Sequence, residues 1–216
     1  MNTFIKTKDN KSQTIGKHEI PLEWWSRGYE YEWAKQFVVK GHNVLDAGCG
    51  IEHPFKYYLA DMGCKVTAVD QNEAINDLKY KNTTFLQNEL KKLSSELPVN
   101  SFDTIFCISV LEHTKSSLKL ILDGFNAILK NDGKVIITFD YPLMTPEELY
   151  EILLQTNLKF DGNLDFETTD KDLVGYHQSY RVFKAVLVKK NKGVAPAETK
   201  VVANIETKVV ANIETK

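Results

Sequence analysis

The chain has 216 residues, which suits one α/β domain with some additions and is short for two full domains. Hydrophobic residues make up 43% and charged residues 26%, the balance of an ordinary globular protein. A formal net charge of -2 lacks the basic excess typical of nucleic-acid binding, and no apolar run is long enough to span a bilayer. We therefore expect no nucleic-acid partner and no membrane partner.

The N-terminus is polar and has no apolar core segment, so it does not resemble a secretory signal. The three cysteines are odd in number and show no CxxC spacing, which disfavours both a disulfide framework and a zinc site. These features predict a cytoplasmic protein with no metal site.

Three regions are expected along the chain. Residues 1–40 form an N-terminal leader and an aromatic-rich helical cap: residues 1–18 are expected to be a mobile polar leader, and residues 21–39 are expected to be largely helical up to Gly41. Residues 41–190 form the main domain. Residues 191–216 form a flexible tail in which VVANIETK occurs twice, with an oligomerisation or docking peptide as the alternative.

The main domain alternates between strands and helices. The strands are apolar almost throughout, as expected when helices cover both faces of a sheet, and this alternation predicts a mostly parallel sheet. Residues 159–166 and 180–188 are close in sequence and are expected to pair antiparallel. The other expected strands are 43–47, 65–69, 83–87, 103–109 and 134–139; the helices are 55–62, 72–80, 118–130 and 146–155; and 90–97 is a connecting segment.

The strongest chemical signal is the segment VLDAGCG at residues 44–50. An apolar strand ends in Asp46, and glycines then let the backbone approach a ligand at a helix start. Asp70 ends the next strand about twenty residues later, where a carboxylate can accept both hydroxyls of a ribose. Together these features predict a nucleoside across the carboxyl ends of two strands. The third glycine of a dinucleotide fingerprint and the GK[ST] of a P-loop are both absent.

The order of motifs resembles the class I S-adenosylmethionine-dependent methyltransferases. VLDAGCG is followed by VTAVD, then by NSFDTIFCISVLEH and by ILKNDGKVIITF, which resembles the family pattern from about residue 43 to 140. The resemblance implies a three-layer, Rossmann-like α/β methyltransferase fold, with a mostly parallel seven-stranded sheet and an antiparallel last strand. It also implies S-adenosyl-L-methionine as cofactor.

The resemblance also implies residue roles. Gly48 and Gly50 would pass close to the methionine half of the cofactor, Asp46 would hold its amino group and Asp70 its ribose. Glu89 would accept the adenine amino group, with Asn88 as the competing candidate. The full cofactor-binding set is Asp46, Gly48, Cys49, Gly50, Asp70, Gln71, Asn88, Glu89 and Ser109.

The sequence departs from the family at one point of the glycine turn. Glu52 stands where the family often has a third glycine, and Pro54 is expected to begin the following helix. Glu52 would either face the positive end of the cofactor or lie exposed at the helix start.

Methyl transfer from a sulfonium is an in-line displacement, in which the protein positions the acceptor and excludes water. A hydroxyl acceptor also needs a base. The catalytic candidates are His113, Asp140 and Tyr141, and His113 could instead line the cofactor site. The substrate-binding candidates are Trp25, Arg27, Tyr29 and His177.

Aromatic residues with Arg and His at 23–33 and 176–181 suit a small polar molecule or a glycan precursor as the acceptor. The [DN]PP[YFW] motif of nucleobase amine methyltransferases is absent after the fourth strand, which disfavours that substrate class. Cys107 lies inside an apolar strand, where a small core cysteine is expected rather than a nucleophile. Two alternatives stay open: a non-catalytic module that binds S-adenosylmethionine or a nucleotide, and an aminopropyl-type transferase. Oligomerisation is left open.

Overall fold

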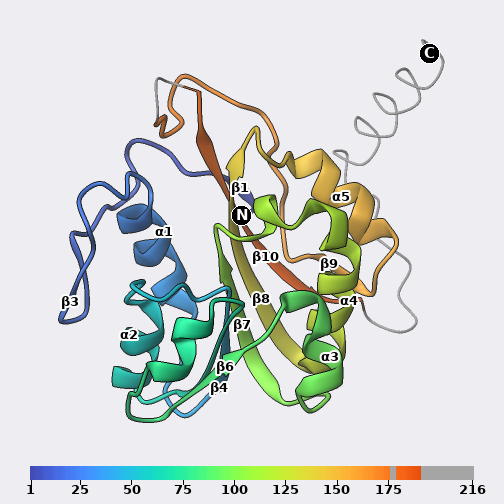
Figure 1. Cartoon of the computed structure of the whole chain (residues 1–216). Helices are drawn as coiled ribbons and strands as arrows, with labels where there is room; N and C mark the ends of the chain where they lie inside the picture. The colour runs from blue at the N-terminus through green and yellow to red at the C-terminus, as the bar shows by residue number, and fades with distance from the viewer. Residues whose placement is uncertain (176–178, 191–216) are drawn as a thin grey trace.

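The computed structural model describes residues 1–175 and 179–190. A central sheet is covered by helices on both faces, which gives three layers (Figure 1). Helices α1 (Arg27–Ala34) and α2 (Phe55–Asp61) cover one face. The other face carries α3 (Leu93–Glu96), α4 (Leu118–Ile128) and α5 (Pro146–Leu154).

The main sheet has eight strands in the order β1-β10-β8-β7-β4-β5-β6, and β9 also pairs with β10. Strands β8, β7, β4, β5 and β6 pair parallel, whereas β10 runs antiparallel to β8, β9 and β1. The expected mostly parallel sheet with an antiparallel last strand is therefore confirmed, and β1 adds an eighth strand. Their bounds are β1 Thr3–Phe4, β4 Asn43–Ala47, β5 Lys65–Asp70, β6 Thr83–Gln87, β7 Phe102–Ile108, β8 Leu129–Tyr141, β9 Leu158–Phe160 and β10 Arg181–Lys189.

The chain reverses its direction of travel across the sheet between β4 and β7. From β4 it moves outward through β5 to β6, and it then returns to β7 and moves the other way to β8. In open α/β sheets the crevice at such a switch point, outside the carboxyl ends of the strands, is the usual ligand site. The fold thus places the ends of β4, β5 and β7 around one crevice.

Helices cover both faces of the sheet because its central strands, β4 and β7, are buried along almost their whole length. In β4, all residues after Asn43 are buried, and two hydrophobic clusters pack against the two faces of the sheet. Helix α5 begins with a capping box in which the side chain of Thr145 accepts from the amide of Glu148 and the Glu148 side chain accepts in return. Capping therefore fixes the start of this helix where Pro146 predicts it.

Several elements differ from expectation in extent. The expected helix at 72–80 is a 3₁₀ helix, Glu73–Asp77, begun by the side chain of Asn72. The connecting segment 90–97 contains a 3₁₀ turn, Leu90–Lys92, before α3. The residues between Leu129 and Lys134, which precede the expected strand 134–139, belong to β8. They form an irregularity in that strand, because the register between β7 and β8 shifts there. The boundaries of these elements thus depend on contacts with neighbouring strands, which the local sequence pattern does not show.

The expectation of a mobile leader at residues 1–18 is wrong. Strand β1 pairs with β10, and Phe4 and Ile5 are buried. The Asn2 side chain accepts from the amide of Val186 at 2.8 Å and donates to the carbonyl of Asp161 at 2.9 Å. The polar composition of residues 1–18 gives no sign of β1, because this strand is stabilised by pairing with the distant strand β10 and not by a local periodic pattern.

The rest of the N-terminal region forms a cap over one face of the sheet (Figure 1). A small hairpin, β2 (Thr14–Ile15) and β3 (His18–Glu19), precedes α1, and a 3₁₀ turn, Lys35–Phe37, follows it. Helix α1 is shorter than the largely helical stretch expected at residues 21–39. The predictions for His177 and for the tail at 191–216 lie outside the described residues. None of the helices in the described part of the chain is long and apolar enough to cross a membrane.

Replacing Phe4 with alanine tests the anchoring of the N-terminus. Phe4 is fully buried and meets the rings of Tyr141 and Phe183 edge-on at 5.4 and 5.2 Å. We expect a loss of about 3–5 kcal/mol in the free energy of unfolding, measured by urea denaturation. Leu22, which is 75% exposed, provides the control. A Phe4→Ala variant as stable as Leu22→Ala would contradict the placement of β1.

Candidate functional site

Two adjoining pockets lie at the carboxyl ends of β4, β5 and β7. The larger has a volume of about 460 Å³ and the smaller about 80 Å³. Gly48 and Ser109 line both, so the two pockets meet at these residues. This is the switch-point crevice that the sheet topology predicts.

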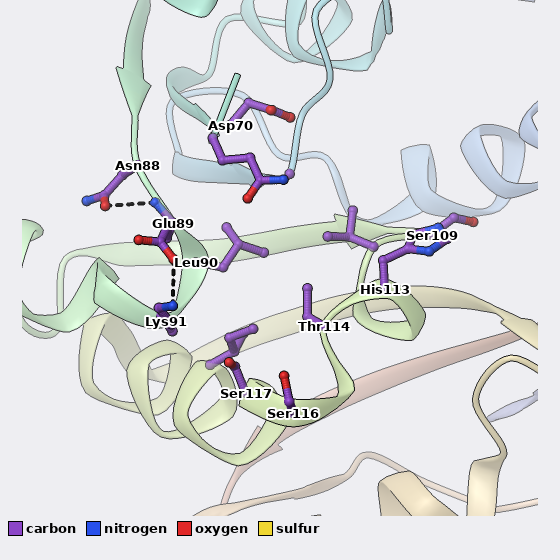
Figure 2. Close-up of a pocket in the computed structure, with 14 residues that line it drawn as sticks. Asp70, Asn88, Glu89, Leu90, Lys91, Ser109, His113, Thr114, Ser116 and Ser117 are labelled. Carbon is purple, nitrogen blue, oxygen red and sulfur yellow. Dashed lines mark hydrogen bonds and ion pairs between the residues drawn. The ribbon is translucent and has the colours of Figure 1, made fainter. Parts of the chain in front are cut away.

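The larger pocket is a polar cleft between the ends of β5 and β6 and the segment that follows β7. Figure 2 shows Asp70 and Asn88 on one side and His113 and Ser117 on the other. The residues lining it are Gly48, Asp70, Gln71, Asn88, Glu89, Leu90, Lys91, Ser109, Val110, His113, Thr114, Ser116, Ser117 and Ile121.

The Asp70 carboxylate is held by two backbone amides. Its Oδ2 accepts from the amide of Gly50 at 2.8 Å, and its Oδ1 accepts from the amide of Asn72 at 3.0 Å. The glycine turn after β4 therefore orients the acid at the end of β5. Each carboxylate oxygen can accept more than one hydrogen bond, so a diol in the pocket would still find acceptors.

Asn88 and Glu89, the two candidates for the adenine end, both line the larger pocket. The Oδ1 atom of Asn88 accepts from the amide of Glu89 at 2.8 Å. The Glu89 carboxylate pairs with Lys91 at 2.6 Å and with Lys92 at 2.5 Å, and these hydrogen bonds lower the pKa of Glu89 to about 2 (Figure 2 draws the Lys91 pair). Glu89 is thus an ionised acceptor at the rim of the pocket.

The glycine turn needs glycine for two separate reasons. Gly48 has φ +72°, and a Cβ there would lie 2.7 Å from both methyl groups of Val110. Gly50 has φ +60°, and a Cβ there would lie 2.2 Å from His53. Both the left-handed backbone and the close approach exclude a side chain. Ser109 also has positive φ, +49°, at the junction of the pockets, and non-glycine strain of this kind clusters at functional sites.

The smaller pocket is lined by a buried donor atom and a buried acceptor atom that have no hydrogen-bond partner among the described residues. These two atoms are the Nε of Arg27 and the Oδ2 of Asp46. Burial raises the pKa of Asp46 to about 7, against the opposing charge of Lys56. The other lining residues are Tyr31, Gly48, Cys49, His53, Phe55, Ile108 and Ser109.

Glu30 ties the cap to the floor of the site. Its buried carboxylate pairs with Arg27 at 2.6 Å and accepts from the hydroxyls of Ser109, at 2.7 Å, and Thr138. Burial alone would raise the pKa of Glu30, but the charge of Arg27 and these hydroxyls outweigh it and hold the pKa below its usual value. Sequence reasoning missed Glu30, because Thr138 lies 108 residues away.

Sequence reasoning also missed His53, which lines the smaller pocket, and the nearby Lys56. The Trp24 ring stacks on His53 with centroids 4.1 Å apart and an interplanar angle of 14°. Desolvation, with the nearby charges of Arg27 and Lys56, lowers the pKa of His53 to about 4, so the ring is neutral. Lys56 is fully buried behind the glycine turn. A charged residue among the apolar residues of α2 is the signal that would have indicated Lys56.

Of the three catalytic candidates, only His113 lines a pocket. Burial and the charge of Glu30 raise the pKa of Asp140 to about 6, and its amide donates to Glu112 at 3.0 Å. The Asp140 Oδ1 atom is buried without a partner in the described part of the chain. Tyr141 packs edge-on to Phe4 beside the core. The structure thus brings His113, but not Tyr141, to the site.

Of the substrate candidates within the described residues, Arg27 alone lines a pocket. Trp25 packs on Gly175, where a Cβ would lie 2.4 Å from its ring, and Tyr29 lies under the ammonium of Lys11 at 5.6 Å. Glu52 is exposed and lines neither pocket, which matches the exposed-acid interpretation. Cys107 is fully buried, as expected for a core cysteine.

Comparison with known proteins points to one family. The model of a family described as "Methyltransferase domain" matches residues 45–137. The chain is 28% identical over 109 residues to a ubiquinone biosynthesis O-methyltransferase of Coxiella burnetii, covering 48% of this chain and 46% of that protein. It is 28% identical over 154 residues to a tRNA U34 carboxymethyltransferase of Pseudomonas savastanoi, covering 65% and 44%. The chain spans about half the length of these relatives.

A solved TehB-like S-adenosylmethionine-dependent methyltransferase of Corynebacterium glutamicum shares the fold, with a TM-score of 0.58, 19% identity and coverage of 74% of this chain and 87% of that one. The strand order, the switch-point crevice and the glycine turn together define a Rossmann-like α/β domain. Residues 45–137 thus match a methyltransferase-domain family, and the TehB-like protein that shares the fold is an S-adenosylmethionine-dependent methyltransferase.

Proposed function

We propose that the two pockets together hold S-adenosylmethionine, with the nucleoside in the larger pocket and the methionine half in the smaller. The observation that carries the proposal is the unpartnered pair of Arg27 Nε and Asp46 Oδ2 in a pocket that continues toward Asp70. A buried donor and a buried acceptor without partners cost stability, and an amino-acid zwitterion satisfies both. Arg27 would bind the carboxylate and Asp46 the ammonium.

The nucleoside end follows from the same geometry. Asp70 would accept the ribose hydroxyls, since Gly50 and Asn72 already fix its carboxylate. Glu89 is the better candidate for the adenine amino group, because its ionised carboxylate offers two acceptor oxygens, whereas the single acceptor oxygen of Asn88 already bonds an amide. Lys91 and Lys92 would have to share Glu89 with the base.

When bound, the cofactor supplies an electrophilic methyl group. The chain's own contribution is to position the acceptor at the junction of the pockets and to exclude water there. Ser109 forms part of that junction, held by Glu30 through its hydroxyl and by the Thr138 carbonyl through its amide at 2.9 Å. His113 lines the larger pocket, and in this proposal it would take a proton from a hydroxyl acceptor.

The acceptor we propose is a small organic molecule that presents a hydroxyl group. The Coxiella relative carries out O-methyl transfer by its name, and this supports oxygen as the attacking atom. The comparisons give no support to the glycan precursor expected from the sequence. The tRNA carboxymethyltransferase supports RNA as the competing acceptor, against which stands the net charge of -2. A cytoplasmic location stays a prediction from the sequence.

The proposal is tested by incubating the protein with methyl-labelled S-adenosylmethionine and with phenolic, glycosyl and RNA acceptors in parallel. Label in a phenolic product together with S-adenosylhomocysteine supports the proposal, and label in RNA overturns the choice of acceptor. A nucleoside product that keeps its methylthio group indicates aminopropyl-type transfer. Binding without turnover of any acceptor indicates the non-catalytic module.

Replacing Asp70 with alanine tests the nucleoside site. We expect the affinity for S-adenosylhomocysteine to fall by about 1–3 kcal/mol, because the ribose hydroxyls lose their acceptor. Calorimetric titration measures this. Asp77, an exposed acid at the end of the adjacent 3₁₀ helix, provides a control, and Asp77→Ala should bind as the wild type does. Unchanged affinity in Asp70→Ala would mean that the ribose lies elsewhere.

Asp46 predicts a pH dependence of binding. The pKa of Asp46 in the free protein is raised to about 7 by burial, and Asp70 adds to this while Lys56 opposes it. Because the proposed ammonium contact requires the ionised carboxylate, affinity for S-adenosylhomocysteine should fall as pH drops below about 7 and level off above it. Calorimetry in buffers of different ionisation enthalpy should detect proton release on binding, and Asp46→Asn should abolish both effects. A flat profile in the wild type would exclude this role.

A further inference from the structure

Lys56 presents a buried ammonium to a single loop. It is the second residue of α2 and is fully buried. Its Nζ donates to the carbonyls of Gly50 at 2.7 Å, Ile51 at 3.0 Å and His53 at 2.5 Å. A buried cation is costly, and a cation in the first turn of a helix opposes the helix dipole. Bonds to these carbonyls offset that cost, so the ammonium and the loop stabilise one another.

The loop that Lys56 holds is the one that orients Asp70. Gly50 accepts from Lys56 through its carbonyl and donates to Asp70 Oδ2 through its amide at 2.8 Å. The two contacts meet on one residue, with φ +60°, whose backbone has no side chain to restrain it. Glu52, which stands where methyltransferases of this type often have a third glycine, is exposed to solvent. The Lys56 ammonium therefore holds this loop, in which Glu52 replaces a third glycine.

We propose that Lys56 is a positioning residue of the cofactor site, holding the 50–53 loop so that the Gly50 amide fixes the Asp70 carboxylate for the ribose. The inference rests on the proposed binding of S-adenosylmethionine, but the contact from Lys56 through Gly50 to Asp70 exists in the protein alone. The proposal gives a role in cofactor recognition to a side chain that itself lines neither pocket.

The chain offers a matched control in Lys190. The Nζ of Lys190 also donates to carbonyls of one turn, those of Leu153 at 2.9 Å and Thr156 at 2.7 Å, at the end of α5 and away from the pockets. Lys56→Met and Lys190→Met thus remove the same kind of contact. Both should lower the melting temperature. S-adenosylhomocysteine affinity, measured by calorimetry, should fall at least about tenfold in Lys56→Met, since a charge-assisted bond is lost, and stay unchanged in Lys190→Met.

A double-mutant cycle separates positioning from general loosening. If Lys56 acts through Asp70, Lys56→Met should cost no further affinity in an Asp70→Ala background. The proposal would be overturned if Lys56→Met bound S-adenosylhomocysteine as tightly as the wild type. It would also be overturned if the fold-losses in affinity of Lys56→Met and Asp70→Ala multiplied in the double variant. Lys56→Gln keeps two donors without the charge; it should retain more affinity than Lys56→Met and serves as the test if the methionine variant does not fold.

A ligand-free readout keeps this test apart from the proposed function. In ¹⁵N-correlated NMR spectra, Asp70→Ala should shift the Gly50 amide resonance, because its acceptor is removed. Lys56→Met should shift the same resonance, and Lys190→Met should not. A wild-type protein that binds no S-adenosylhomocysteine would refute the proposed function, while an unmoved Gly50 resonance in Lys56→Met would refute the role of Lys56.

Discussion

Replacing Arg27 with methionine is expected to destabilise the fold by about 3–5 kcal/mol, because it leaves the Glu30 carboxylate buried without its cation. Glu30 is completely buried, and its 2.6 Å contact with Arg27 is an ion pair within one turn of α1. The hydroxyls of Ser109 and Thr138 remain as partners but carry no charge. Urea denaturation measures the loss, and a change below about 1 kcal/mol would show that the pair contributes little.

The same substitution should also remove the proposed carboxylate contact, and a second variant separates the two effects. In Arg27→Met/Glu30→Gln the buried charge is gone and the amide can still bond Ser109 and Thr138, so most of the stability should return. Affinity for S-adenosylhomocysteine should not return, because the guanidinium facing the smaller pocket is missing. If the double variant regains both stability and affinity, Arg27 supports the fold and does not bind the cofactor.

Replacing Gly48 with alanine should nearly abolish cofactor binding. The added Cβ would lie 2.7 Å from Val110, at the junction of both pockets, and the residue would keep the unfavourable φ of +72°. We expect about 1–3 kcal/mol of backbone strain, together with a displaced turn that no longer fits the ligand.

Gly41 provides the control for the Gly48 variant. It has φ +86° and no atom within 4 Å of a built Cβ, so Gly41→Ala introduces backbone strain alone. Its melting temperature should fall while its affinity for S-adenosylhomocysteine in calorimetric titration stays at the wild-type value. Equal affinity in Gly41→Ala and Gly48→Ala would contradict the placement of the turn against the ligand.

The sequence predicts the sheet and its crevice well, because both depend on local patterns. The apolar strand before Asp46 and the acid at Asp70 lie where the alternation places them, and six of the nine predicted cofactor residues line the larger pocket. Buried parallel strands are continuous apolar runs, and the carboxyl ends of such strands meet at one edge. Glycine turns and strand-end acids are therefore visible without a structure.

Polar contacts between distant segments are not visible in this way. Glu30 resembles any acid on an amphipathic helix until Ser109, just after β7, and Thr138, in β8, approach it in the fold. Asn2 and Phe4 lie in a polar stretch, and only the edge of β10 makes them buried. Tyr141 ends a strand where a catalytic residue is expected, yet its ring packs against Phe4. The N-terminal segment is thus the common cause of the largest departures from expectation.

The central claim is that the crevice at the ends of β4, β5 and β7 binds S-adenosylmethionine. Calorimetric titration of the full chain with S-adenosylmethionine and S-adenosylhomocysteine, with NAD and ATP as controls, tests it most directly. We predict micromolar binding of the first two, on the order of 8 kcal/mol, with neither control binding. Absence of binding by both sulfur nucleosides, or equal binding of NAD or ATP, would contradict the assignment of Arg27, Asp46 and Asp70 to this cofactor.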